Sequence, residues 1–129
     1  MLLCLVALGT ACGSSSEQPD LNGTTWTLTS WAEPTSIPAG VTITAEFADD
    51  RVAGSAGINR YNAAVTTGRD GSFSIDQAVT TKMAGAEDAT AAEMAFLKRL
   101  QAATSYAVDG DTLVINDADG QTSLTFTRA

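Results

Sequence analysis

The chain has 129 residues with 15 acidic and 7 basic side chains, which gives a net charge of −8, and it contains no histidine. This negative charge disfavours binding to nucleic acids and to anionic membrane surfaces, since both depend on lysine and arginine. The lack of histidine removes the commonest general base and metal ligand. The length suits a single domain with one hydrophobic core. We therefore expect one small acidic domain, a monomer that binds no nucleic acid.

The first 20 residues differ in composition from the rest of the chain. Residues 1–11 are uncharged, mostly apolar and end in small residues, which is typical of a secretion signal. They are too few to span a bilayer, for which about 20 are needed. Ala11 and Cys12 resemble the cleavage site of a bacterial lipoprotein, although Gly9 departs from the usual leucine. We predict a signal peptide over residues 1–11, lipidation of Cys12 and a flexible tether over residues 12–20. The alternative is a plain secretion signal cleaved near Ala11, which leaves Cys12 as an ordinary thiol.

The predicted N-terminus indicates where the protein works. Cys4 would leave with the signal peptide and Cys12 would carry lipid, so the mature domain would have no thiol for a disulfide. Each buried methylene group of an acyl chain contributes about 0.8 kcal/mol to membrane binding, and two chains suffice for a stable anchor. We expect the domain at the extracytoplasmic face of the cell envelope, with the lipid on Cys12 as its contact with the membrane.

The first half of the predicted domain, which spans residues 21–129, has the patterns of β-strands. Threonine and tryptophan are frequent at its start, and apolar residues then alternate with polar ones. These patterns predict strands over residues 23–31, 41–47, 51–54, 61–67 and 73–83. Asp49 and Asp50 form a predicted hairpin turn, and residues 68–71 form another.

One helix is predicted over residues 91–103. Thr90 and Glu93 match a capping box, in which the threonine hydroxyl accepts a backbone hydrogen bond and the glutamate reaches back to the helix start. Apolar residues at spacings of three and four form one stripe, which comprises Met94, Phe96, Leu97, Leu100 and Ala103. We expect this stripe to pack in the core.

The C-terminal third is predicted to be a meander of three short strands around residues 106–108, 113–115 and 124–126. Turns rich in Asp and Gly, at residues 109–111 and 117–120, separate them. Strands on both sides of a single helix indicate an α+β fold. We expect a curved, mainly antiparallel sheet, a partly open barrel, with the helix packed on it.

Asp117 and Asp119, which precede Gly120, match part of a calcium-binding loop. The EF-hand pattern requires an acidic ligand about six residues after the glycine. Phe126 occupies that place, so the match fails and a turn explains these residues better. We expect no metal and no other cofactor.

Two segments carry a family resemblance: GSAGINRY at residues 54–61 and TTKMAG at residues 80–85. They resemble the signatures G-x-x-G-C-N-x-[FY] and T-T-[RK]-M-A-C of the META domain, also called the HslJ-like family. The opening LNGTTW and the closing LTFTR of the domain match the ends of that family. The resemblance implies an exported or lipid-anchored bacterial domain with a curved sheet and one helix. It also implies loose associations with stress and secretion, and no agreed biochemical activity.

The resemblance singles out a set of signature residues with a structural or binding role. They are Gly54, Gly57, Asn59, Arg60, Tyr61, Thr80, Thr81, Lys82 and Met83. The glycines permit positive φ angles or a close approach of the backbone, and the asparagine amide can bond turn backbone. The family often has cysteine where this chain has Ile58 and Gly85. Since no histidine is present to activate a hydroxyl, we expect no enzyme activity.

Two classes of function remain from the sequence. The first is a non-enzymatic, lipid-anchored envelope module that binds a protein or acts under stress. The alternative is a carrier of a small apolar ligand in the hollow between sheet and helix. They differ in whether the large apolar side chains fill the interior or line a cavity; these side chains are Trp26, Phe47, Phe73, Met83, Met94 and Phe96. We favour a filled interior, because a domain of this size has little apolar bulk to spare.

Overall fold

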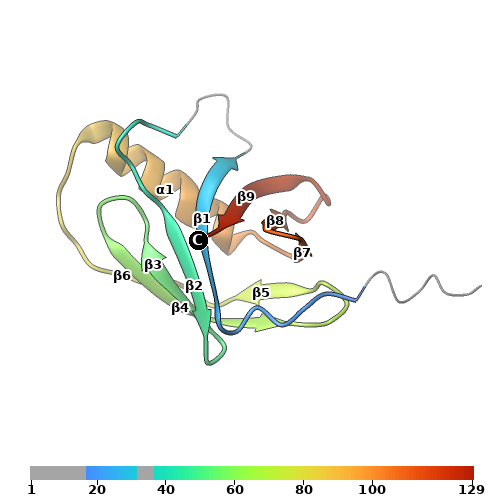
Figure 1. Cartoon of the computed structure of the whole chain (residues 1–129). Coiled ribbons are helices and arrows are strands. Elements are labelled where there is room, and N and C mark those ends of the chain that lie inside the picture. Colours follow the sequence, from blue (N-terminus) through green and yellow to red (C-terminus); the bar gives the residue numbers. More distant parts are fainter. Residues whose placement is uncertain (1–16, 32–36) are drawn as a thin grey trace, which may run out of the picture.

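A computed structural model describes residues 17–31 and 37–129 (Figure 1). The described chain contains one helix, α1 (Glu87–Gln101). Its strands are β1 (Thr24–Trp31), β2 (Thr44–Ala48), β3 (Arg51–Ser55), β4 (Arg60–Thr67), β5 (Phe73–Ile75), β6 (Val79–Thr80), β7 (Ser105–Asp109), β8 (Thr112–Asn116) and β9 (Thr122–Arg128). The predicted signal peptide and Cys12 lie outside the described residues.

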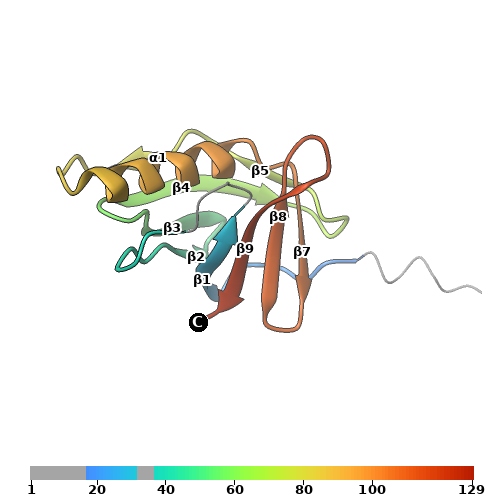
Figure 2. The same ribbon diagram turned by 90° about the horizontal axis from the view of Figure 1, so that it is seen from above.

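The strands form one antiparallel sheet that curls almost into a closed barrel (Figure 2). Its order is β5-β4-β3-β2-β1-β9-β8-β7, and β6 pairs with β4 beyond the end of β5. The two outer strands meet through a bridge between Ser72 and Ser105. The Tyr106 N–H also donates to the Gly71 carbonyl at 2.8 Å. The predicted α+β fold, with a curved antiparallel sheet and one helix, is confirmed.

The hairpin between β2 and β3 shows how local sequence sets this sheet. The side chains of Phe47 and Val52 point inward and are buried, while Glu46 and Arg51 on the same strands are exposed. Asp49 and Asp50 both have left-handed φ angles, of 55° and 60°. Two such residues form the tight turn whose twist suits an antiparallel hairpin, and Asp tolerates that conformation. The predicted turn is therefore confirmed.

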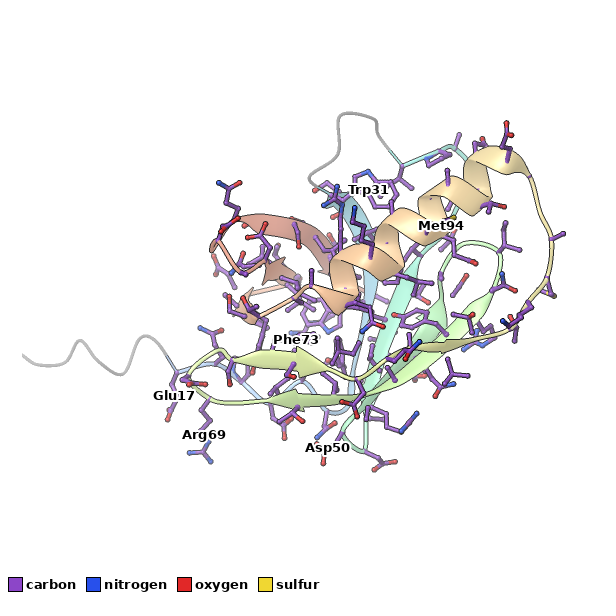
Figure 3. All side chains as sticks on the ribbon, turned by 180° about the vertical axis from the view of Figure 1, so that it is seen from behind. Glu17, Trp31, Asp50, Arg69, Phe73 and Met94 are labelled. Carbon is purple, nitrogen blue, oxygen red and sulfur yellow. The ribbon has the colours of Figure 1, made fainter. Side chains whose placement is uncertain are left out.

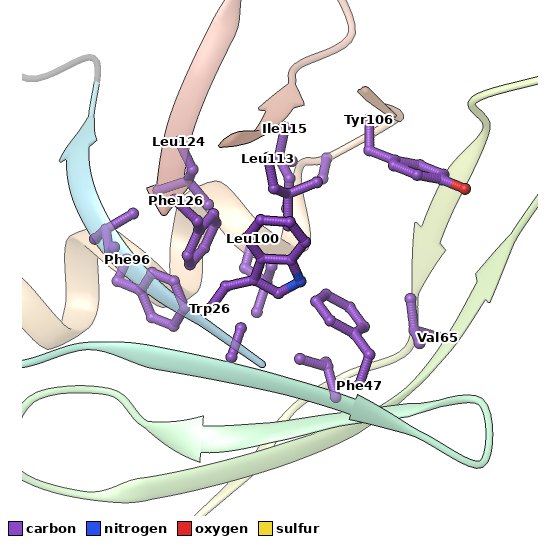
Figure 4. Packing of buried hydrophobic residues seen from close by; sticks show 14 of the residues in the cluster. Trp26, Phe47, Val65, Phe96, Leu100, Tyr106, Leu113, Ile115, Leu124 and Phe126 are labelled. Atoms are coloured by element: carbon purple, nitrogen blue, oxygen red, sulfur yellow. The ribbon is translucent and has the colours of Figure 1, made fainter. Parts of the chain in front are cut away.

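Aromatic side chains fill the interior (Figure 4). Phe47, Phe73 and Tyr106 form one edge-to-face series, with ring centroids 6.4 and 6.3 Å apart. A second series links Tyr61 and Phe126 through a common neighbour, Phe96 of α1. Such pairs contribute about 0.5–1.5 kcal/mol beyond the area that they bury.

Met83 and Met94, in contrast, lie at the surface, with 59% and 66% of their area exposed. Neither methionine therefore fills or lines the interior. The placement of Met94 in the buried stripe is wrong. Phe96 is only two residues away, and side chains two apart on a helix do not share a face.

The predicted start of the helix is also wrong. The helix begins at Glu87 after Ala86, and no side chain caps it. The Thr90 hydroxyl lies inside the first turns and donates to the Ala86 carbonyl at 3.0 Å. Glu87 and Asp88 suit the positive end of the helix dipole, so the acidic first turn marks the start better than the capping-box pattern. The helix ends at Gln101, two residues before the predicted end.

The strand predicted over residues 73–83 is broken in the structure. β5 ends at Ile75 and β6 covers only Val79–Thr80. Between them, the Gln101 side chain of α1 accepts from the Ala78 N–H and donates to the Asp76 carbonyl, both at 3.0 Å. These contacts tie the intervening backbone to the helix, although the Asp76 N–H still donates to the Ala64 carbonyl of β4 at 3.0 Å. The strand predicted over residues 41–47 likewise starts only at Thr44.

The last described part of the predicted tether packs against the domain. The Gln18 N–H donates to the Arg69 carbonyl at 2.7 Å. The Tyr106 hydroxyl donates to the Pro19 carbonyl, also at 2.7 Å. Gln18 and Pro19, which were predicted to belong to the tether, are thus bonded to the folded domain. No helix within residues 17–31 and 37–129 combines the length and apolar character needed to cross a membrane.

Candidate functional site

The signature residues come together around the side chain of Asn59, at the end of the barrel where β4 begins. Asn59 is 6% exposed. Its Oδ1 accepts from the Met83 N–H at 2.6 Å and from the Thr81 hydroxyl at 2.8 Å. Its Nδ2 donates to Glu93 Oε2 at 2.8 Å and to the Met83 carbonyl at 3.2 Å. An amide side chain has two donor hydrogens and two acceptor lone pairs. All four are used here, so none is left for a substrate.

Glu93 of α1 completes this arrangement, which we call the Asn59 cluster (Asn59, Thr81, Met83 and Glu93). The glutamate is 8% exposed. Its Oε1 accepts from the backbone N–H of Asn59 at 2.7 Å and of Ile58 at 3.1 Å. Hydrogen bonds to a carboxylate are among the stronger ones in proteins. The cluster therefore fixes the β3–β4 loop, the segment after β6 and the helix to one another.

The sequence did contain a signal for the role of Glu93. The buried face of α1 comprises Ala92, Glu93, Phe96 and Leu100. Glu93 is the only acidic residue on that face, and a buried carboxylate requires hydrogen-bond partners. The capping box predicted the wrong hydrogen-bond donor for Glu93, because its actual donors lie on another segment, more than thirty residues away.

Gly54 and Tyr61 hold the neighbouring strands together. A Cβ at Gly54 would overlap the Thr44 carbonyl, so only glycine permits this approach. The Tyr61 hydroxyl donates to the same carbonyl at 2.7 Å, and the Tyr61 side chain is 1% exposed. Burial raises the pKa of Tyr61 well above its usual value, while the charge of Arg60 opposes that shift. Its burial and its bond to the backbone thus favour the neutral phenol.

The remaining signature side chains face solvent or support the backbone. The Arg60 N–H donates to the Thr81 hydroxyl, and the Thr81 N–H returns a bond to the Arg60 carbonyl, both at 3.1 Å. The side chains of Arg60, Lys82 and Met83 are exposed. Gly57 has a φ of 123°, which side chains rarely adopt. A shallow hollow of about 210 Å³ on the outer face of β4 and β6 adjoins Arg60 and Thr80.

Ile58 and Gly85, the two positions at which the META signatures given above have cysteine, are in contact. A Cβ at Gly85 would overlap Ile58 Cδ1 and lie 2.7 Å from its Cγ1 and 3.2 Å from its Cγ2. Ile58 is half-buried and packs against Gly85, which is itself exposed. The Ile58 Cβ lies more than 3.2 Å from the Cβ position at Gly85. Because it is bonded to Cγ1, it also lies within about 4.2 Å of that Cβ position. This separation overlaps the range of about 3.5–4.5 Å between the Cβ atoms of a disulfide, so a large and a small residue pack where two cysteines would lie close together.

A second recess lies at the opposite end of the barrel. This open groove of about 630 Å³ is lined by residues 17–20, Asn22, Asp50, residues 67–69 and Tyr106. Most of these side chains are polar or charged, which does not suit an apolar ligand. Across residues 17–31 and 37–129, no three carboxylate or other ligand side chains gather in a way that could hold a metal ion. In the β8–β9 turn the Asp117 carboxylate accepts from the backbone N–H of Asp119 and Gln121, as the predicted turn requires.

Comparison with known proteins connects this site to a family. The family model described as the META domain matches residues 19–129. A protein from Burkholderia xenovorans, solved by NMR, is 24% identical, with a TM-score of 0.72 and coverage of 84% of this chain and 83% of that chain. A DUF4847 family protein from Bacteroides vulgatus is 16% identical, with a TM-score of 0.61 and coverage of 83% and 93%. At these identities the two structures show a shared fold alone. No curated protein matches the sequence.

Proposed function

Because the chain belongs to the META domain family, we propose that it is a non-enzymatic domain, lipid-anchored at the cell envelope, that binds an envelope protein or acts there under stress. The observation that carries this proposal is that the two buried signature side chains, Asn59 and Tyr61, are fully engaged inside the fold. The Asn59 amide has no free donor or acceptor, and the buried Tyr61 hydroxyl donates to a backbone carbonyl. The signature therefore serves as a frame, and recognition is left to surface groups.

The chemistry of the site supports the absence of catalysis. A general acid or base must reach the substrate and exchange a proton with it. Glu93 is buried beneath the β3–β4 loop, where both of its oxygens accept hydrogen bonds. No histidine is present anywhere in the sequence. The Thr81 hydroxyl, beside Arg60 and Lys82, is engaged within the fold, because it donates to Asn59 Oδ1 and accepts from the Arg60 N–H.

The lipid anchor is supported by the N-terminal sequence and by the charge of the domain. Cys12 follows an apolar segment that ends in small residues. The net charge of −8 gives the folded part little attraction for anionic lipid. Membrane attachment would then depend on covalent lipid, and two acyl chains are sufficient for it.

The alternative, a carrier of an apolar ligand, is less well supported by the interior. Trp26, Phe47, Phe96 and Phe126 are all almost completely buried and interlock there. The two methionines that could have lined a hollow are exposed instead. The groove near residues 17–20 is polar, so it does not favour an apolar ligand either.

Two cysteine variants of the full chain test the anchor. Cys12→Ala should abolish incorporation of a labelled fatty acid and release the protein from the membrane fraction. Cys4→Ala is the matched control, since Cys4 would leave with the signal peptide, and it should change neither readout. Membrane retention of Cys12→Ala at the level of the control would contradict the proposal.

A second experiment separates the binding module from the carrier. The domain purified from its own host is extracted with organic solvent, and the extract is measured by mass spectrometry. We expect no apolar molecule in stoichiometric amount, because the aromatic core occupies the interior. Recovery of one such molecule per domain would replace the proposal with the carrier function.

A further inference from the structure

Residues 17–22 form a strap that fastens the start of the domain to one end of the barrel. Gln18 joins the two outer parts of the sheet: its N–H donates to the Arg69 carbonyl at 2.7 Å, and its Oε1 accepts from the Val108 N–H at 2.9 Å. Arg69 lies in the β4–β5 turn and Val108 in β7, on opposite sides of the seam. The strap therefore crosses the place where the barrel closes.

The strap is held along its whole length. The Tyr106 hydroxyl donates to the Pro19 carbonyl at 2.7 Å, and Leu21 is buried in the core. Asn22 and Asp50 exchange two hydrogen bonds of 3.0 Å, from Asn22 Nδ2 to Asp50 Oδ1 and from the Asp50 N–H to Asn22 Oδ1. Figure 3 shows Glu17, Arg69 and Asp50 along this side of the molecule, which we call the strap end.

The strap end and the Asn59 cluster lie at opposite ends of β4. The strand starts at Arg60, next to the cluster, and finishes at Thr67, next to the turn that bonds Gln18. Eight residues of antiparallel strand span about 24 Å. The Asn59 cluster therefore lies about 24 Å from the strap end, where the chain enters the domain.

Covalent geometry limits how far the domain can move from a lipid on Cys12. Four residues separate Cys12 from Glu17, and such a link extends to about 18 Å at most. This reach is shorter than β4, so the cluster end cannot turn over to lie on the membrane. Without the strap, the link would run to Thr24 at the start of β1 and reach about 43 Å. Either end could then meet the membrane.

We infer that the strap fixes the orientation of the domain on the bilayer, with the strap end facing the lipid and the Asn59 cluster facing away. The inference rests on the lipid anchor of the proposed function. The groove at the strap end is lined by the carboxylates of Glu17, Asp20 and Asp50 and by the guanidinium of Arg69. These charges give no adhesion to anionic lipid, so the short link sets the orientation and the cluster end is presented to partners.

The test compares two labelled positions on the lipidated full chain in vesicles. Arg69→Cys places a fluorophore at the strap end, and Lys82→Cys places the same fluorophore beside the cluster. Both side chains are exposed, and both substitutions remove one positive charge. The ion pair of Arg69 with Glu17 is 3.9 Å long and solvent-exposed, so its loss should cost little. With Cys4 cleaved and Cys12 lipidated, each variant has one free thiol.

A quencher attached to lipid headgroups should dim the label at position 69 more strongly than the label at position 82. Insertion of about ten Gly and Ser residues before Glu17 adds about 36 Å of reach and should remove most of the difference without altering the fold. Equal quenching at the two positions, or stronger quenching at position 82, in vesicle-bound protein would overturn the inference. Failure of the unlabelled protein to bind vesicles would instead overturn the anchor on which it rests.

Discussion

Replacement of Asn59 by alanine tests whether the signature is a frame. The variant removes all four hydrogen bonds of the amide. Glu93 Oε2 loses a donor, and the Met83 N–H loses its acceptor. The backbone of the β3–β4 loop is left in place, because Glu93 Oε1 still accepts from it. The change is therefore confined to the contacts of one side chain.

The expected loss follows from the burial of these contacts. An ordinary hydrogen bond contributes about 1 kcal/mol net, and one to a charged group about 1.5–3 kcal/mol. Thr81 and Met83 belong to an exposed segment, which can rehydrate after the change. The bond to Glu93 lies in the interior and cannot. We expect Asn59→Ala to lower the free energy of unfolding by about 3–5 kcal/mol, a large share of the 5–15 kcal/mol typical of a domain.

Urea unfolding followed by tryptophan fluorescence measures this loss, since Trp26 is fully buried in the folded protein. Asn62→Ala is the matched control on the same strand. The Asn62 amide faces outward and bonds the exposed side chain of Arg51. We expect the control to change stability by no more than about 0.5 kcal/mol. A loss for Asn59→Ala as small as that of the control would refute the role of the cluster as a frame.

Three further predictions concern cross-linking, capping and pH. The double variant Ile58→Cys/Gly85→Cys should form a disulfide. Closure of a loop of about 27 residues should raise the free energy of unfolding by about 3.5 kcal/mol in the chain-entropy model. Equal urea midpoints for the oxidised and reduced protein would count against this prediction. Thr90→Ala should change the free energy of unfolding by less than about 0.5 kcal/mol, because the Thr90 hydroxyl does not cap the helix. A loss of about 1–2 kcal/mol on urea unfolding would instead indicate that Thr90 is the N-cap, as the sequence predicted. Burial raises the pKa of both tyrosines, Tyr61 and Tyr106, whereas in the unfolded chain they ionise near pH 10. Stability should therefore be unaffected by them below about pH 10 and fall above it. Tyrosinate absorbance of the folded protein should rise at higher pH than that of the unfolded chain, and identical titrations of the two states would contradict this.

The strands were predictable because their signal is local. Along β4 the side chains of Tyr61, Ala63 and Val65 are buried, while those between them are more exposed. That alternation is written in the sequence itself. The turn at Asp49 and Asp50 is similarly local, since two residues that tolerate left-handed angles are enough to close a hairpin.

The contacts that organise the candidate site were not predictable in this way. Glu93 is 34 residues from Asn59, and Gln18 is 90 residues from Val108. The local pattern therefore predicted that Glu93 pairs with Thr90, whereas in the structure it accepts hydrogen bonds from Ile58 and Asn59. The break between β5 and β6 has the same origin, because Gln101 of the helix holds the intervening backbone. Residue spacing alone carries no information on such pairs.

The two ends of the barrel now have different physical roles. At one end the Asn59 cluster joins loop, segment and helix, which leaves the exposed side chains of Arg60, Lys82 and Met83 on a stiff support. At the other end the strap fastens the chain within a few residues of Cys12. A rigid surface binds with less loss of conformational entropy than a mobile one. If a short link also holds that surface away from the lipid, the surface stays accessible to a partner protein. The proposed binding of an envelope protein requires such access.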